Sequence, residues 1–152
     1  MPNIGFILEA WDGWRKTQLW SLEVHDMFKA NEDSIIKLMA NYHQPRQKFL
    51  PQKECIEIFT RDTDIMLEKE ALIAYGMSKM PLVKETTENS KYKRIMSNPE
   101  FYEMIGRVAE FKHKDQPNLS LSEKIGLVLD KILPIVNLKR KNPKGNEVVD
   151  ES

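Results

Sequence analysis

The sequence predicts an all-α protein, and three observations support this class. Glycine is scarce, with six residues in 152, and runs of β-branched residues are rare. Glu, Lys, Leu, Met and Ile recur at the three- and four-residue spacing of an amphipathic helix. Prolines and capping residues stand at the ends of these periodic stretches. A chain of this length can bury a sizeable core in one domain.

The first periodic stretch predicts one long helix that begins before Met27 and continues to about Tyr42. Its apolar positions follow the three-four step, acidic and basic residues stand between them, and Pro45 stops it. A second helix is predicted from about Gln52 to Phe59. Its apolar stripe includes Cys55, so we expect this thiol to be buried and inert.

Three further helices follow. Asp62 or Asp64 offers an N-cap before a third helix, which the apolar spacing places near residues 68–80. The sequence Ser97-Asn98-Pro99-Glu100 starts a fourth helix, with proline at its first position. A capping box of Ser120 and Glu123 starts a fifth helix, which Pro134 ends.

The pattern divides the chain into three parts. Residues 1–19 form an arm rich in aromatic side chains, and residues 20–137 form the helical domain. Residues 138–152 lose the helical periodicity and predict a basic, flexible tail.

Composition excludes several classes of protein. The 23 Lys and Arg side chains balance 23 Asp and Glu, so the chain lacks the basic excess of a general nucleic-acid binder. No apolar run reaches the roughly 18 residues that span a bilayer, and no secretory signal is apparent at the start. The lone Cys55 excludes an internal disulfide. We therefore expect a cytoplasmic protein.

Two segments share a pattern. Lys48 to Phe59 reads KFLPQKECIEIF, and Arg94 to Ile105 reads RIMSNPEFYEMI. Each has a basic residue, two apolar residues, a polar stretch and a glutamate that opens an amphipathic helix. The alignment superposes Leu50 on Met96, and it superposes Glu54 on Glu100.

This pattern resembles the EF-hand (calmodulin-like) family over roughly residues 20–112. The resemblance implies two helix–loop–helix units with twelve-residue loops at 43–54 and 89–100. An additional C-terminal helix follows this pair. It places Leu50 and Met96 at loop position 8, where the two loops pair, and Glu54 and Glu100 at position 12. The motifs FTRDTD, YGMSKM and PEFYEMIGRVAEF also look similar to small EF-hand-like proteins of cilia and flagella.

The two loops depart from the calcium-binding pattern. Calcium requires six to eight oxygen ligands, several of them carboxylates. The first loop has His43, Pro45 and Gln47 at positions 1, 3 and 5, and the second has Asn89, Lys91 and Lys93 there. We therefore expect no calcium, no other metal and no cofactor, and we find no arrangement of residues that supports catalysis.

Three tryptophans crowd into the arm and its junction with the domain: Trp11, Trp14 and Trp20. Two interpretations stay open. These side chains pack on their own domain, or they anchor a partner protein, since tryptophan dominates interface hot spots.

The basic cluster Lys139, Arg140 and Lys141 has two interpretations as well. It keeps the tail soluble, or it contacts an acidic surface such as that of tubulin. It has no interleaved aromatic residues for stacking on nucleic-acid bases.

These observations favour a non-catalytic structural module for protein–protein interaction. By resemblance, its setting is a ciliary, axonemal or other cytoskeletal assembly, and its partners are other proteins, with tubulin or an apolar partner helix as candidates. Nucleic acid and membrane are not expected partners. The alternative is a calcium-responsive, calmodulin-like regulatory subunit.

Overall fold

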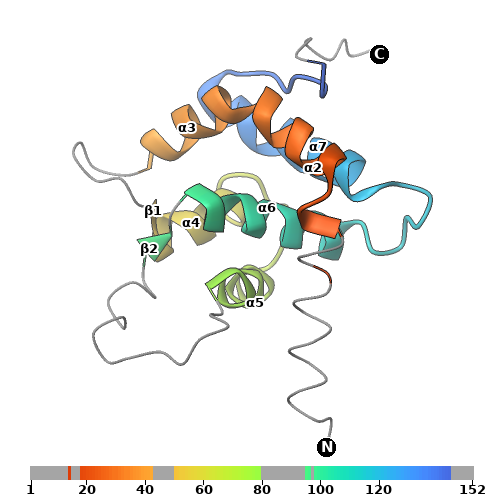
Figure 1. Cartoon of the computed structure of the whole chain (residues 1–152). Helices are drawn as coiled ribbons and strands as arrows, with labels where there is room; N and C mark the ends of the chain where they lie inside the picture. The colour runs from red at the N-terminus through yellow and green to blue at the C-terminus, as the bar shows by residue number, and fades with distance from the viewer. Residues whose placement is uncertain (1–13, 15–17, 43–49, 80–94, 97, 145–152) are drawn as a thin grey trace, which may run out of the picture.

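The computed structural model describes residues 14, 18–42, 50–79, 95–96 and 98–144. Within them the fold is all-α apart from two strands of two residues each. The order of elements is α2 (Leu22–Ala30), α3 (Glu32–Ala40), β1 (Leu50–Pro51), α4 (Gln52–Phe59), α5 (Glu68–Lys79), β2 (Ile95–Met96), α6 (Asn98–Lys112), α7 (Leu121–Ile132) and the 3₁₀ turn η3 (Leu133–Val136). Helix α6 lies at the centre. Helices α4 and α5 pack on one side of the molecule, while α2, α3 and α7 lie on the other (Figure 1).

The two strands join segments that are far apart in the sequence. They pair antiparallel, with Leu50 opposite Met96 and Pro51 opposite Ile95. The first of these pairs, Leu50 with Met96, is also superposed by the internal repeat, so the backbone register agrees with the alignment of the two units at that position. The ladder places the start of α4 beside the start of α6.

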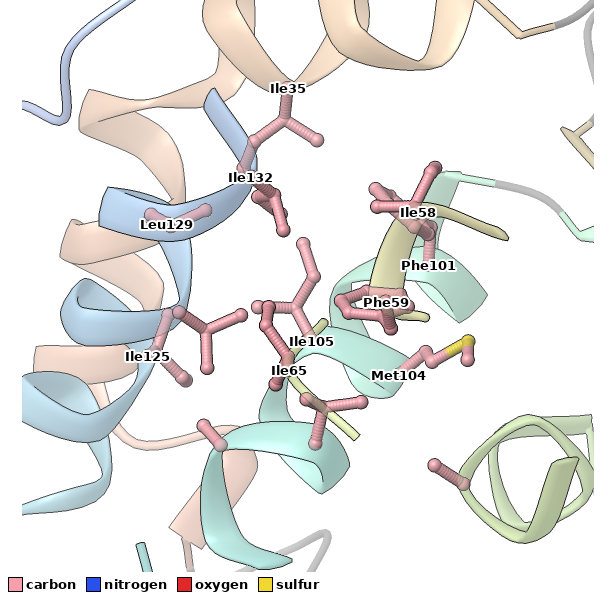
Figure 2. Packing of buried hydrophobic residues seen from close by; sticks show 14 of the residues in the cluster. Ile35, Ile58, Phe59, Ile65, Phe101, Met104, Ile105, Ile125, Leu129 and Ile132 are labelled. Atoms are coloured by element: carbon pink, nitrogen blue, oxygen red, sulfur yellow. The ribbon is translucent and has the colours of Figure 1, made fainter. Parts of the chain in front are cut away.

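Apolar side chains from both sides of α6 form one core. Figure 2 shows Ile35 from α3 and Ile132 from α7 pointing toward Ile105 of α6, while Phe59 of α4 lies beside Phe101. The rings of Phe59 and Phe101 are 6.0 Å apart between centroids, and both side chains are fully buried. Each buried side chain of this size stabilises the fold by about 1.5–3 kcal/mol.

The long helix predicted up to Tyr42 is in fact two helices, which corrects the prediction. The break falls at Asn31, whose φ and ψ are −110° and 9°. The Asn31 amide donates hydrogen bonds to the carbonyls of Met27 (2.8 Å) and Lys141 (2.9 Å), and its oxygen accepts one from the Lys141 N–H (2.7 Å). The side chain is fully buried, so these bonds fix the break.

The predicted N-cap at Asp62 or Asp64 is also wrong. Helix α5 begins at Glu68, where the Leu67 N–H donates to the Glu70 carboxylate at 2.9 Å. Asp62 instead accepts hydrogen bonds from the side chains of Tyr42 and Arg61. Asp64 adopts a left-handed φ of 54° in the turn that follows α4.

The local signals for α4 and for the start of α7 are confirmed. Helix α4 has the predicted bounds, and the capping box of Ser120 and Glu123 opens α7. The Ser120 hydroxyl accepts from the Glu123 N–H, and the Glu123 carboxylate accepts from the Ser120 N–H, both at 3.2 Å. Reciprocal bonds of this kind depend only on residues three apart, so the sequence alone could reveal them.

The segment after η3 corrects the prediction that the chain is flexible from residue 138. Leu138 packs against the core, and Lys141 is bonded to Asn31 as described above. The Arg140 guanidinium binds both oxygens of Asp130 on α7, at 2.9 and 3.2 Å. It lies against Gly126, where a Cβ would approach Arg140 Nη1 to 2.9 Å. Residues 138–142 therefore belong to the folded domain.

Candidate interaction site

An open groove lies between α2 and α6, with a volume of about 750 Å³. We call it the α2–α6 groove. It is lined by Leu19, Trp20, Leu22, His25, Phe28, Lys29, Glu32, Pro99, Tyr102 and Glu103. The apolar members come from the segment before α2, from α2 itself and from the first turns of α6, so the groove exists only in the folded chain.

The floor of the groove is aromatic. The rings of Phe28 on α2 and Tyr102 on α6 are stacked, with centroids 4.9 Å apart and planes at 23°. Burial, together with the charges of Glu32 and Asp33, raises the pKa of Tyr102 to about 12. A phenol is protonated at neutral pH, and the Tyr102 hydroxyl can therefore donate a hydrogen bond to a bound carbonyl or carboxylate.

The rim of the groove exposes two large apolar side chains. Trp20 is 63% exposed and Leu22 is 73% exposed, although both lie within three residues of the buried Leu19. The Ser21 hydroxyl caps α2 by accepting from the Val24 N–H, which fixes the direction of the chain here. The apolar pair is therefore presented by an ordered helix start.

The structure gives different surroundings to Trp14 and Trp20, two of the three tryptophans that the sequence grouped together. Trp14 is half-buried against its own domain, and its ring lies 4.0 Å from the Arg107 guanidinium carbon. Gly106 of α6 lies beneath it, and a Cβ there would be in ordinary van der Waals contact with the Trp14 ring, at 3.4 Å. Trp20 points to solvent at the groove, and Trp11 lies outside the described residues.

The basic cluster is also divided. Lys139 is exposed, but the Arg140 guanidinium is held by Asp130 and the Lys141 backbone is held by Asn31. The cluster thus contributes to the fold.

The two glutamates that the resemblance places at loop position 12 lie in the first turns of helices α4 and α6. Glu54 lies in the first turn of α4, where a carboxylate is favoured by the helix dipole. Glu100 Oε2 lies 2.7 Å from the Lys79 ammonium at the end of α5. No local pattern in the sequence relates Lys79 to a glutamate in another helix, so this ion pair could not be predicted.

The described residues show no constellation for metal or thiol chemistry. No group of three or more His, Cys, Asp and Glu side chains is placed to hold a metal ion within the described ranges, which omit most of both loops. Cys55 is fully buried, 3.2 Å from the Met104 sulfur, and burial raises the pKa of its thiol well above the ordinary value. The reactive thiolate is therefore scarcely populated at neutral pH.

The sequence patterns did not identify Leu22, Phe28 and Tyr102 as parts of a site. Phe28 belonged to the apolar stripe of the predicted first helix, and the α2–α6 groove forms only when two helices that are far apart in the sequence meet. The local sequence offered one indication of this site, which is the large apolar Leu22 two residues after Trp20.

Comparisons with known proteins give no relative: no family model, no curated protein and no solved structure matches this chain. Among the described helices, none combines the length and the apolar character that crossing a membrane requires.

Proposed function

We propose that the chain is a non-catalytic module for protein–protein interaction that docks an apolar segment of a partner protein in the α2–α6 groove. The observation that carries the proposal is the exposure of Trp20 and Leu22 beside an aromatic floor. Large apolar side chains gathered at a concave surface mark interaction sites, and tryptophan supplies much of the binding energy there.

The setting we propose is a ciliary, axonemal or other cytoskeletal assembly, and the partners are other proteins. This part of the proposal rests on the resemblance to EF-hand-like proteins. The pairing of Leu50 with Met96 supports two related units, because the repeat superposes the same two residues. Tubulin and an apolar partner helix remain candidate partners.

We further propose that docking does not depend on calcium. Glu100 is already paired with Lys79, so a divalent ion would have to compete with an ammonium 2.7 Å from the carboxylate. Apart from its final glutamate, each loop sequence contains no carboxylate. The interaction surface is then permanent rather than switched.

The docking proposal is tested by capture of the partner from native extract with wild-type and variant chains. Trp20→Ser combined with Leu22→Ser removes the exposed apolar pair and leaves the fold intact, since neither side chain is in the core. We expect at least about a tenfold loss of the captured partner. Leu127→Ser, at an exposed position on α7, is the matched control and should retain it. Equal capture by the double variant would overturn the proposal.

The calcium proposal is tested by titration calorimetry at millimolar calcium. We expect no saturable heat and no change in thermal unfolding when a chelator is added. A saturable signal that Glu100→Gln abolishes would instead support a calcium-responsive regulatory subunit.

A further inference from the structure

The arm that precedes Trp14 contains an apolar stripe of its own. Residues 1–13 lie outside the described part of the chain, but their sequence has helical spacing. The stripe consists of Ile4, Ile7, Leu8 and Trp11, which follow the steps i, i+3, i+4 and i+7. Phe6 and Glu9 fall on the opposite side of such a helix. This is the spacing with which an amphipathic helix anchors itself in an apolar groove.

The arm joins the described domain at one end of the α2–α6 groove. The Arg107 guanidinium carbon lies 4.0 Å from the centroid of the Trp14 ring, and Arg107 Nε lies 3.6 Å from the carboxylate of Glu103, which lines the groove. Leu19 lines the groove as well, and its Cδ1 would lie 2.7 Å from a Cβ on Gly106. The segment before Trp14 therefore starts about one turn of α6 away from the groove lining.

The stripe and the groove have the same length. On α2 the lining residues run from Leu22 to Lys29, which are seven positions and about 10 Å apart along the helix. Ile4 and Trp11 are also seven positions apart, so a helix places them about 10 Å from each other. With Trp11 held near Trp14, the stripe extends along the groove from one end to the other.

The charges at the far end of the groove favour this direction. Since Trp11 stays near Trp14, the N-terminal end of a docked helix points toward the start of α3. Glu32 lines the groove there and Asp33 follows it, and both side chains are exposed. The N-terminus of a helix carries a partial positive charge that nearby carboxylates stabilise.

We propose that residues 4–11 bind as a helix in the α2–α6 groove of the same molecule and compete there with the partner protein. The docked stripe covers Trp20 and Leu22, the exposed pair on the rim. A partner then binds only the fraction of molecules in which the arm has left the groove, which lowers its apparent affinity. The competition rests on the proposed function of the groove, whereas occupation by the arm requires no partner.

The reactivity of a thiol in the groove tests this in the full chain without a partner. The sole native cysteine, Cys55, is fully buried, so His25→Cys supplies an accessible thiol in the groove lining. We expect Ile7→Ser with Leu8→Ser to speed its labelling by a maleimide about tenfold, as for a groove that was occupied about nine-tenths of the time. Phe6→Ser, on the opposite side of the arm helix, is the matched control and should leave the rate unchanged.

A cysteine elsewhere reveals any general effect of the arm variants. Ile73 on α5 is 64% exposed and does not line the groove, so labelling of Ile73→Cys should not respond to the arm. Equal rates at His25→Cys with and without the stripe, or an equal increase for Phe6→Ser, would overturn the proposal. Protection of this thiol by the stripe would support the arm even where the groove variants still capture the partner, a result that overturns the docking proposal alone.

Disulfide trapping identifies which molecule supplies the arm. In dilute protein under mild oxidation, Ile7→Cys with His25→Cys should form a disulfide within one chain, which runs as a monomer on a non-reducing gel. Phe6→Cys with His25→Cys should form it more slowly, because position 6 faces away from the groove. Covalent dimers as the main product would assign the groove to the arm of a second copy and overturn the intramolecular contact.

Discussion

Asp62 shows how one exposed residue ties two segments together. Its carboxylate accepts from the Tyr42 hydroxyl, beyond the end of α3, and from Arg61 Nε at 2.9 Å. Arg61 and then Tyr42 lower the pKa of Asp62 below its ordinary value of 3.8. A carboxylate with a lowered pKa adds stability that is fully present above the ordinary pKa and is lost as pH falls through the folded-state pKa.

We predict that Asp62→Asn lowers the free energy of unfolding at pH 7 by less than about 1 kcal/mol, since the group is exposed to solvent. The difference between variant and wild type should shrink as pH falls below the ordinary value, because protonation removes the same charge. Urea unfolding at several pH values measures this. Tyr42→Phe should cost less in the Asp62→Asn background than in wild type, and equal costs would show that the two residues act independently.

At the scale of the helices, the space around a glycine shows whether that surface of the helix is packed against a neighbour or open. On α6 a Cβ at Gly106 would lie 2.7 Å from Leu19 Cδ1, so this glycine lets the segment before α2 pack directly on the helix. On α5 Gly76 meets nothing. The same substitution should therefore have opposite effects at the two positions.

We predict that Gly106→Ala destabilises the fold by about 1 kcal/mol, because overpacking outweighs the gain in helix propensity. Gly76→Ala should stabilise the fold by about 0.5–1 kcal/mol. Urea midpoints test both variants. If Gly106→Ala stabilised the fold as much as Gly76→Ala does, Leu19 would not be packed closely against Gly106.

Sequence patterns predicted the elements whose signals are local. The capping box at Ser120 and the apolar stripe of α4 depend on residues a few positions apart, and both are confirmed. The break at Asn31 could not be predicted, because its side chain is fixed by the backbone of Lys141, 110 positions away. The groove is non-local in the same sense, since the Phe28–Tyr102 stack joins two helices that the sequence does not relate.

For the whole molecule, the C-terminal segment closes the fold. Loss of periodicity after Leu138 indicated a tail, but periodicity reports helices and says nothing of irregular segments that bond to distant side chains. Here Lys141 pairs with Asn31 at the α2–α3 break, and Arg140 pairs with Asp130 on α7. One short segment thus joins elements from both ends of the chain.

We predict that deletion of residues 138–152 lowers the free energy of unfolding by at least about 2 kcal/mol. It leaves the buried Asn31 amide without its partners on Lys141 and uncovers the core beneath Leu138. Deletion of residues 145–152 is the matched control, because it spares every one of these contacts, and it should change stability little. Thermal and urea unfolding of both variants measure this difference. Equal stability of the two deletion variants would show that residues 138–144 form a free tail. Their basic side chains would then again be candidates for contact with an acidic partner.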